Sequence, residues 1–166
     1  MRVFGVVGWK NQGKTTLVER LIPELAGRGL RVSTVKHAHH AAELDMPGRD
    51  SHRHRTAGAA EVLLASAARV AVIEELRGAP GPPLPALLRR LQPADLVLIE
   101  GFKTAPHPKL EVFRAAACAH APYALSDASV RFLVGDAGPH AVPVPVLPDD
   151  IAAIANAVLD AAAPLP

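Results

Sequence analysis

Cysteine is nearly absent from this chain, and long apolar runs are absent altogether. The single cysteine, Cys118, excludes an internal disulfide and a zinc site made of four cysteines. Although 49% of the residues are apolar, no run approaches the roughly 18–20 residues of a membrane-spanning helix. An apolar, β-rich run begins at Val3, so we expect no signal peptide. These absences predict a soluble, cytoplasmic protein without a membrane partner.

Excess charge of either sign is lacking as well. The chain has 18 lysines and arginines against 16 acidic residues, which gives a net charge of +2. Such a balance gives no reason to expect nucleic acid as a partner. With 166 residues and no internal repeat, the chain is long enough for one domain with its own core.

What the sequence does contain is a phosphate-binding pattern. Residues Gly8 to Thr16 fit G-x-x-x-x-G-K-[ST], the P-loop. An apolar run, Val3 to Val7, precedes the pattern, and apolar residues at helical spacing follow it. In that context backbone N–H groups surround a phosphate at the positive end of a helix. Lys14 can reach the outer phosphates and the Thr15 hydroxyl can bind Mg²⁺. No [NT]-K-x-D segment follows the later strands, so these residues do not identify the base.

Strands and helices are predicted to alternate along the rest of the chain. Predicted strands cover residues 30–36, 60–66, 69–74, 95–101 and 130–135, and predicted helices cover 84–91 and 151–162. The short link between 60–66 and 69–74 indicates a hairpin, although it lacks the usual glycine. Asp149 or Asp150 can cap the last helix. The expected fold is a P-loop NTPase-like α/β layered fold. A mostly parallel sheet flanked by helices, with a hairpin extension, forms one P-loop nucleotide-binding domain over residues 1–166.

A carboxylate and a glycine end the strand predicted at 95–101. Glu100 lies at its carboxyl end, the edge where ligands bind in open α/β sheets, and is our candidate Mg²⁺ carboxylate. The alternative is a structural salt bridge from Glu100 to Lys14 or Lys103. Gly101 permits close approach of the backbone. Asp95 starts the strand and should lie at the opposite edge.

A polar segment follows the second strand. Asp45 and Asp50 lie in it, and either can position water or metal near the phosphates. Five of the eight histidines fall between His37 and His54, which suggests zinc, nickel or copper. The competing interpretation is a polar loop, because no cysteine lies nearby and the sequence predicts no firm helix to fix ligand spacing.

Taken in order, these motifs resemble one family. The matching segments are Gly8–Leu17, Thr34–His37 with His40, Asp45, Gly48, Asp50–Ser51, Arg55, Ala57–Ala59, Leu98–Lys103 and Pro108–Arg114. The chain is similar to the molybdopterin-guanine dinucleotide biosynthesis protein B (MobB) family over most of its length to about Arg114. A P-loop alone is weak evidence, whereas its combination with Glu-Gly-Phe-Lys and Pro-Lys-Leu-Glu-Val-Phe-Arg is specific.

The resemblance implies a GTP-binding, homodimeric, cytoplasmic adapter with at most a slow GTPase activity. Such a protein assists the attachment of GMP to molybdopterin. The transfer itself belongs to a partner, the molybdenum cofactor guanylyltransferase, and molybdopterin and acceptor molybdoenzymes are further candidate partners. Carried over, the nucleotide-binding residues are Lys10, Asn11, Gln12, Gly13, Lys14, Thr15, Thr16, Glu100 and Gly101. Thr15 and Glu100 face Mg²⁺, and Asp45 and Asp50 face the γ-phosphate as catalytic candidates.

Two other functions remain open at this stage. A nickel-insertion accessory GTPase, a metallochaperone, also joins a P-loop to histidines, but it should present cysteine near histidine. Here Cys118-Ala119-His120 is the sole approximation. A small-molecule P-loop kinase needs an arginine-rich lid, which Arg49, Arg53 and Arg55 can supply. Stoichiometric metal binding would favour the first, and rapid phosphorylation of a metabolite the second.

Overall fold

The computed structural model describes residues 1–38 and 45–165 and divides into two compact units. The first unit combines Met1–His37 with Leu84–Pro166, and the second is Ala38–Pro83. Whether the chain acts as one domain stays a prediction. Among the described residues, no helix is long and apolar enough to cross a membrane.

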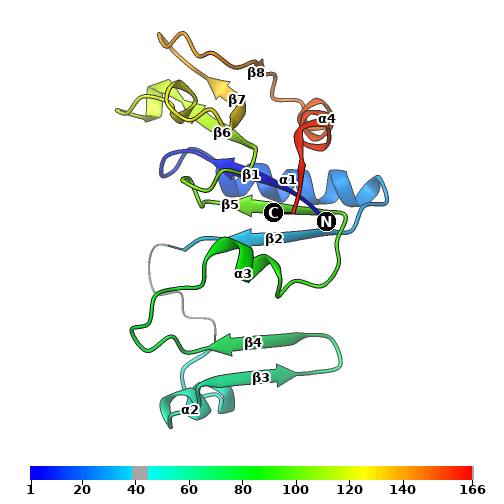
Figure 1. The fold of residues 1–166 in the computed structure, drawn as a ribbon, viewed down its shortest axis with the longest axis vertical. Coiled ribbons are helices and arrows are strands. Elements are labelled where there is room, and N and C mark those ends of the chain that lie inside the picture. Colours follow the sequence, from blue (N-terminus) through cyan, green and yellow to red (C-terminus); the bar gives the residue numbers. More distant parts are fainter. Residues whose placement is uncertain (39–44, 166) are drawn as a thin grey trace. The chain divides into compact units, whose positions relative to one another are not determined.

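A parallel sheet forms the centre of the first unit (Figure 1). Its strands lie side by side in the order β2-β5-β1-β6-β7-β8, and β9 pairs antiparallel with β1. The bounds are β1 Arg2–Val7, β2 Val32–Lys36, β5 Leu96–Glu100, β6 Lys109–Arg114, β7 Val130–Asp136, β8 Val146–Leu147 and β9 Ala163–Pro164. The helices are α1 Lys14–Gly27, α3 Leu84–Leu88 and α4 Ile151–Ala161, with short 3-10 turns at Ala115–Ala117 and Tyr123–Leu125. The predicted, mostly parallel sheet flanked by helices is confirmed.

Alternate side chains of the central strands pack on opposite faces of this sheet. Phe4 and Leu98 belong to a core that α1 and α4 complete, whereas Val3 and Ile99 pack with Leu84 and Leu88. Both faces are thus covered, which explains why β1 and β5 are almost continuously apolar in sequence. Asp150, one of the two predicted caps, accepts hydrogen bonds from two backbone N–H groups in the first turn of α4.

The second unit contains the predicted hairpin and one helix that the sequence analysis did not predict. Strands β3 Glu61–Ala65 and β4 Val70–Glu74 pair antiparallel. At the turn, the Ser66 hydroxyl accepts hydrogen bonds from the N–H groups of Ala68 and Arg69, which replaces the missing glycine. Helix α2, Asp50–Thr56, corrects the expectation of an irregular segment there. Its acidic first turn and basic last turn match the helix dipole.

The sequence analysis also missed the strand β6. Its alternating sequence places Lys109 and Glu111 inside the sheet, and both side chains are fully buried. Strand β6 pairs with β1 on one side and β7 on the other, so it lies next to the P-loop. The predicted helix at 84–91 is shorter in the structure and ends at Leu88.

Candidate nucleotide-binding site

The segment between β1 and α1 has the geometry of an anion-binding loop. Gly13 lies in the left-handed region at φ 96° and immediately precedes α1. Having no side chain, Gly13 leaves the first N–H groups of this helix without a side-chain cap. Those groups and the positive end of the helix dipole favour a phosphate at this position.

An open cavity of about 380 Å³ lies over this helix start. Its lining consists of Asn11, Gly13, Lys14, Thr15, Thr16 and Arg114. Five of these six are predicted phosphate-binding residues, so the structure brings most of the predicted set together. Lys10 is exposed on the same loop, and its role stays a prediction.

Gln12 has its side chain committed to holding the loop in place. The side chain is fully buried; its Nε2 donates to the Ala117 carbonyl at 3.1 Å, and its Oε1 accepts from the Arg114 N–H at 2.6 Å. These two bonds tie the P-loop to the end of β6. Any contact from Gln12 to phosphate must therefore come from its backbone.

Lys14 reaches back across the loop. Its Nζ donates to the Trp9 carbonyl at 2.6 Å. Partial burial lowers the pKa of this lysine, and the nearby positive charges of Lys103 and Lys36 act in the same direction, while Glu100 opposes them. An anion entering the loop would relieve this crowding of positive charge.

Glu100 meets the P-loop at the carboxyl end of β5. Its Oε1 accepts a hydrogen bond of 2.9 Å from the Thr15 hydroxyl and lies 3.4 Å from the Nζ of Lys36. The Glu100 partner is thus Lys36, on the neighbouring strand β2, rather than the Lys14 or Lys103 that we considered. Sequence analysis missed Lys36 because only the strand pairing places it opposite Glu100.

The Thr15–Glu100 pair fits what Mg²⁺ requires at a nucleotide site. Mg²⁺ is usually held by one or two carboxylates together with phosphate and water, not by a cage of side chains. A hydroxyl and a carboxylate 2.9 Å apart beside an anion-binding loop provide such a partial set. No cluster of three or more metal-ligating side chains is found in the described part of the chain.

Gly101, just after Glu100, adopts a positive φ that favours glycine. Its φ is 99°, and a Cβ there would lie 2.8 Å from the Cβ of His37. The close approach predicted for Gly101 is therefore made to the end of β2. The His37 ring stacks on Phe102 with 4.4 Å between ring centroids, which uses this histidine in packing.

The two catalytic candidates lie in the second unit. The side chain of Asp45 is nearly buried and forms a bidentate salt bridge with Arg55. The guanidinium of Arg55 also forms a salt bridge with Glu75. The hydrogen bond from Arg55 lowers the pKa of Asp45, although burial opposes the shift. To orient water, Asp45 would have to release at least one oxygen from Arg55. Asp50 is highly exposed, 3.8 Å from Arg53. Both roles stay predictions.

The histidine segment gives no further support to a metal site. His39 and His40 lie outside the described residues. The Nδ1 of His52 accepts a long hydrogen bond from Gly48. Near the isolated Cys118, the ring of His120 stacks on Trp9 with 4.1 Å between ring centroids.

Comparison with known proteins identifies the family. The family model described as Molybdopterin guanine dinucleotide synthesis protein B, MobB, matches residues 3–136 of this chain. The chain belongs to this family.

Relatives of the MobB family agree with this assignment. The chain is 42% identical over 118 residues to the molybdopterin-guanine dinucleotide biosynthesis adapter protein of Haemophilus influenzae, covering 68% of this chain and 63% of that protein. It is 39% identical over 117 residues to the adapter protein of Escherichia coli, covering 69% and 67%. The crystal structure of Bacillus subtilis MobB matches with a TM-score of 0.75 at 26% identity, covering 98% of each chain. The alignment to the Haemophilus protein spans less than two thirds of that relative's length.

The segment Pro108–Arg114 contains two fully buried charged side chains, Lys109 and Glu111. The Nζ of Lys109 donates to the carbonyls of Lys103 and Ala105, at 2.8 and 2.6 Å, and to Asp127. Glu111 accepts from the N–H groups of Tyr123 and Ala124, both at 2.9 Å. These bonds hold two loops beside the P-loop. Burial raises the pKa of Glu111, while the two backbone bonds oppose the shift.

An aromatic cluster, defined here as Trp9, His120 and Tyr123, lies against the same loop. Trp9 stacks on Tyr123 as well as on His120, and its Nε1 donates to the Ala121 carbonyl at 3.0 Å. Lys103 lies over the Trp9 ring and donates to the Tyr123 hydroxyl at 2.7 Å. Sequence analysis missed this cluster because Trp9 is more than a hundred residues from His120 and Tyr123 in the sequence.

Proposed function

We propose that this protein is a GTP-binding adapter that assists the attachment of GMP to molybdopterin, which produces the guanine dinucleotide form of the molybdenum cofactor. The observation that carries the proposal is a P-loop with its Thr15–Glu100 pair in a chain that belongs to the MobB family. The curated relatives carry the name adapter protein. Family membership favours this function over the metallochaperone and the kinase.

The loop would hold the phosphates of GTP, and Mg²⁺ would bind at its outer end. Backbone N–H groups at the start of α1 favour the negative charge, and Lys14 would turn from Trp9 to the outer phosphates. Thr15 and Glu100 would hold the metal, which neutralises charge on the phosphate oxygens. Lys36 would then move away from Glu100 or pair with a phosphate, since Mg²⁺ would take its place.

The transfer step itself is better assigned to the guanylyltransferase partner. Guanylyl transfer needs attack on the α-phosphate, whereas the P-loop surrounds the whole phosphate chain. In residues 1–38 and 45–165 we find no acid–base pair beside the P-loop cavity that could promote attack on the α-phosphate. The adapter would deliver GTP, or bring the transferase together with molybdopterin or an acceptor enzyme, in the cytoplasm.

A homodimer is the proposed assembly. The hairpin carries four of the exposed large apolar side chains, at residues Leu63, Leu64, Val70 and Val72. Within the described part of the chain, β3 and β4 pair only with each other, so each has an unpaired edge. A second copy would cover both the apolar side chains and the edges.

A reconstituted assay tests the adapter function. Molybdopterin, molybdate, limiting GTP and Mg²⁺ are incubated with the guanylyltransferase, with this protein, and with both. We expect the pair to give more guanine dinucleotide than the transferase alone, this protein alone to give none, and Lys14→Ala to abolish the gain. Product formation by this protein alone would make it the transferase. Equal yield with and without it would refute the adapter function.

A further inference from the structure

The order of the strands decides in which direction a bound nucleotide runs along the sheet edge. Strands β5 and β2 lie on one side of β1, and β6 and β7 lie on the other. Glu100 and Lys36, with Thr15, mark the β5 side as the metal end. A Mg²⁺ ion held by Thr15 and Glu100 would neutralise the outer phosphates of the nucleotide. The nucleoside end of the molecule therefore points toward β6 and β7.

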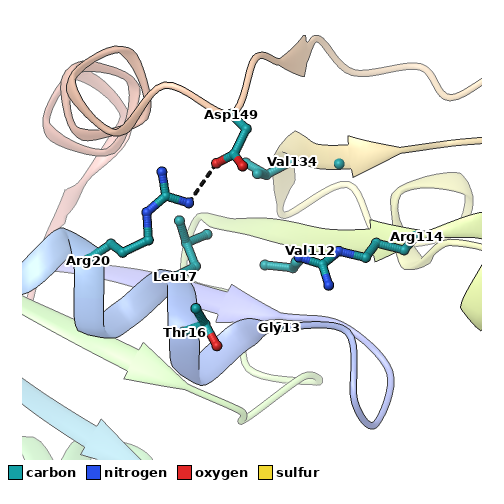
Figure 2. A pocket seen from close by; sticks show the side chains of 9 residues that line it. Gly13, Thr16, Leu17, Arg20, Val112, Arg114, Val134 and Asp149 are labelled. Atoms are coloured by element: carbon teal, nitrogen blue, oxygen red, sulfur yellow. Dashed lines mark hydrogen bonds and ion pairs between the residues drawn. The ribbon is translucent and has the colours of Figure 1, made fainter.

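A second cavity lies on that side of the loop. It has a volume of about 100 Å³ and shares Gly13, Thr16 and Arg114 with the phosphate cavity. Its other lining residues are Leu17, Arg20, Val112, Val134, Gly135 and Asp149. Apolar walls with a few charged groups are what a planar, partly polar ring requires. Figure 2 shows Arg20 and Asp149 meeting above Leu17, with Arg114 on another side of the pocket.

Arg114 supplies a positive charge where the two cavities join. One nitrogen of its guanidinium lies 3.3 Å from where a Cβ on Gly13 would be. The Arg114 backbone is itself fixed by Gln12. A guanidinium beside the first turn of α1 can donate charge-assisted hydrogen bonds to the α-phosphate, the one attached to the nucleoside.

Asp149 is held at the rim of the second cavity. Its Oδ1 accepts a hydrogen bond of 2.6 Å from Arg20 on α1, and its side chain is 72% exposed. Among the described residues no other partner of this carboxylate is found, so Oδ2 is available to a ligand. The next residue, Asp150, caps α4 through bonds to Ala152 and Ala153, which fixes the backbone at this point.

We propose that this second cavity holds the base and that Asp149 selects guanine by its carboxylate. Guanine presents two adjacent N–H donors, at N1 and at the 2-amino group, and an ionised carboxylate is an acceptor alone. Adenine presents an acceptor at N1 and loses that match. Arg20 positions the carboxylate. This inference rests on the proposed nucleotide binding, and it supplies the base reader that the absent [NT]-K-x-D segment would have provided.

Binding of four nucleotides to the wild-type protein is the first test. Calorimetry with Mg²⁺ should give the tightest binding for GTP, about tenfold weaker binding for ITP, which lacks the 2-amino group, and at least about a hundredfold weaker binding for ATP and XTP. Equal affinity for GTP and ATP would overturn the base proposal while leaving nucleotide binding intact. Failure to bind any of them would overturn both.

Asp149→Asn is the second test. The amide donates to the 2-carbonyl of xanthine and accepts from its N1–H, so XTP binding should tighten and GTP binding should weaken, each about tenfold or more. Asp160→Asn is the matched control, because Asp160 is exposed on α4 and loses the same charge without lining the cavity; its affinities should equal the wild-type values. Circular dichroism confirms folding. An unchanged ratio of GTP to XTP affinity in Asp149→Asn would refute the role of Asp149.

Discussion

Glu100 is held in place by two partners that belong to the proposed nucleotide site. Its Oε1 binds the Thr15 hydroxyl and lies 3.4 Å from Lys36, so the carboxylate is oriented before any metal binds. A salt bridge of purely structural value would not require the Thr15 contact. The metal-facing role of this carboxylate stays a prediction, which these two contacts support.

Removal of the Glu100 charge should change metal dependence more than folding. In Glu100→Gln the shape remains but the charge that a hard cation prefers is lost, so the Mg²⁺ concentration needed for tight GTP binding should rise about tenfold or more. Calorimetry across a Mg²⁺ series measures this, and binding of GDP without metal should change little. Glu19→Gln, an exposed position on α1, is the control. The same Mg²⁺ dependence in Glu100→Gln and wild type would leave Glu100 a structural role only.

His107 should make the stability of the fold depend on pH. Its ring is buried, both nitrogens lack a partner among the described residues, and burial together with Lys109 lowers its pKa to about 4, against the opposing effect of Asp127. In the unfolded chain the pKa is about 6.5. Between these values the unfolded state binds a proton that the native state does not, so stability falls as pH drops from 6.5 to 4, by about 3 kcal/mol in all.

Substitution of His107 should remove this dependence. Urea unfolding of the wild type at pH 7, 6, 5 and 4.5 should show the loss, and His107→Leu should show a flatter profile whatever its stability at pH 7. The comparison of slopes is informative because the substitution has its own constant cost. The lowered pKa of Asp127 contributes only near and below pH 4. Parallel profiles for the two proteins would contradict the assignment to His107.

At the scale of elements, the hairpin β3–β4 is notable because it exposes large apolar side chains. Val62 and Ile73 face each other and are buried, whereas Leu63 and Val72, the next pair, are 62% and 53% exposed. Two-stranded hairpins are marginal in water unless one face is covered. The exposed pair is therefore the expected contact with a second copy.

A charge on the exposed side of the hairpin should break the proposed dimer without disturbing the core. We expect Val72→Lys to shift the protein toward monomer at micromolar concentration in sedimentation velocity, because an unpaired charge in an apolar interface is costly. Ala26→Lys adds the same charge to an exposed turn of α1 and should leave the dimer intact. A wild type that sediments as a monomer, or a Val72→Lys dimer as tight as the wild type, would refute this interface.

For the whole molecule, the arrangement predicts slow GTP turnover. Fast hydrolysis needs a positive group that neutralises transition-state charge, and an arginine in that role is worth roughly 10³–10⁵ in rate. Arg55 is already paired with two carboxylates in the second unit, whereas Arg49 and Arg53 are exposed and would serve only if their segment closed over the phosphates. In the nucleotide orientation proposed above, Arg114 would face the inner phosphate. We expect well under one turnover per second from the isolated protein, measured as phosphate release, with Lys14→Ala as the control for contaminating activity. Several turnovers per second would exclude the adapter role as proposed.

Local patterns were sufficient to predict much of this protein. The P-loop, the buried strands β1 and β5 and the hairpin are encoded by residues close in sequence, because side-chain periodicity and turn chemistry act over a few residues. Glu100 was proposed in the same way, since the carboxyl end of a buried parallel strand is a binding edge in open α/β sheets.

The remaining features depend on contacts between distant residues. Strand β6 was missed because its alternating charges, Lys109 and Glu111, resemble an exposed strand until two loops fold over to bond them. The pairing of Lys36 with Glu100 and the approach of Arg114 to Gly13 depend on strand order, which no local pattern specifies. The sequence by itself determined the loop between β1 and α1 at which we propose that phosphate binds. Only the tertiary structure decided which charges surround it, because neighbours across a sheet are set by how the whole chain packs.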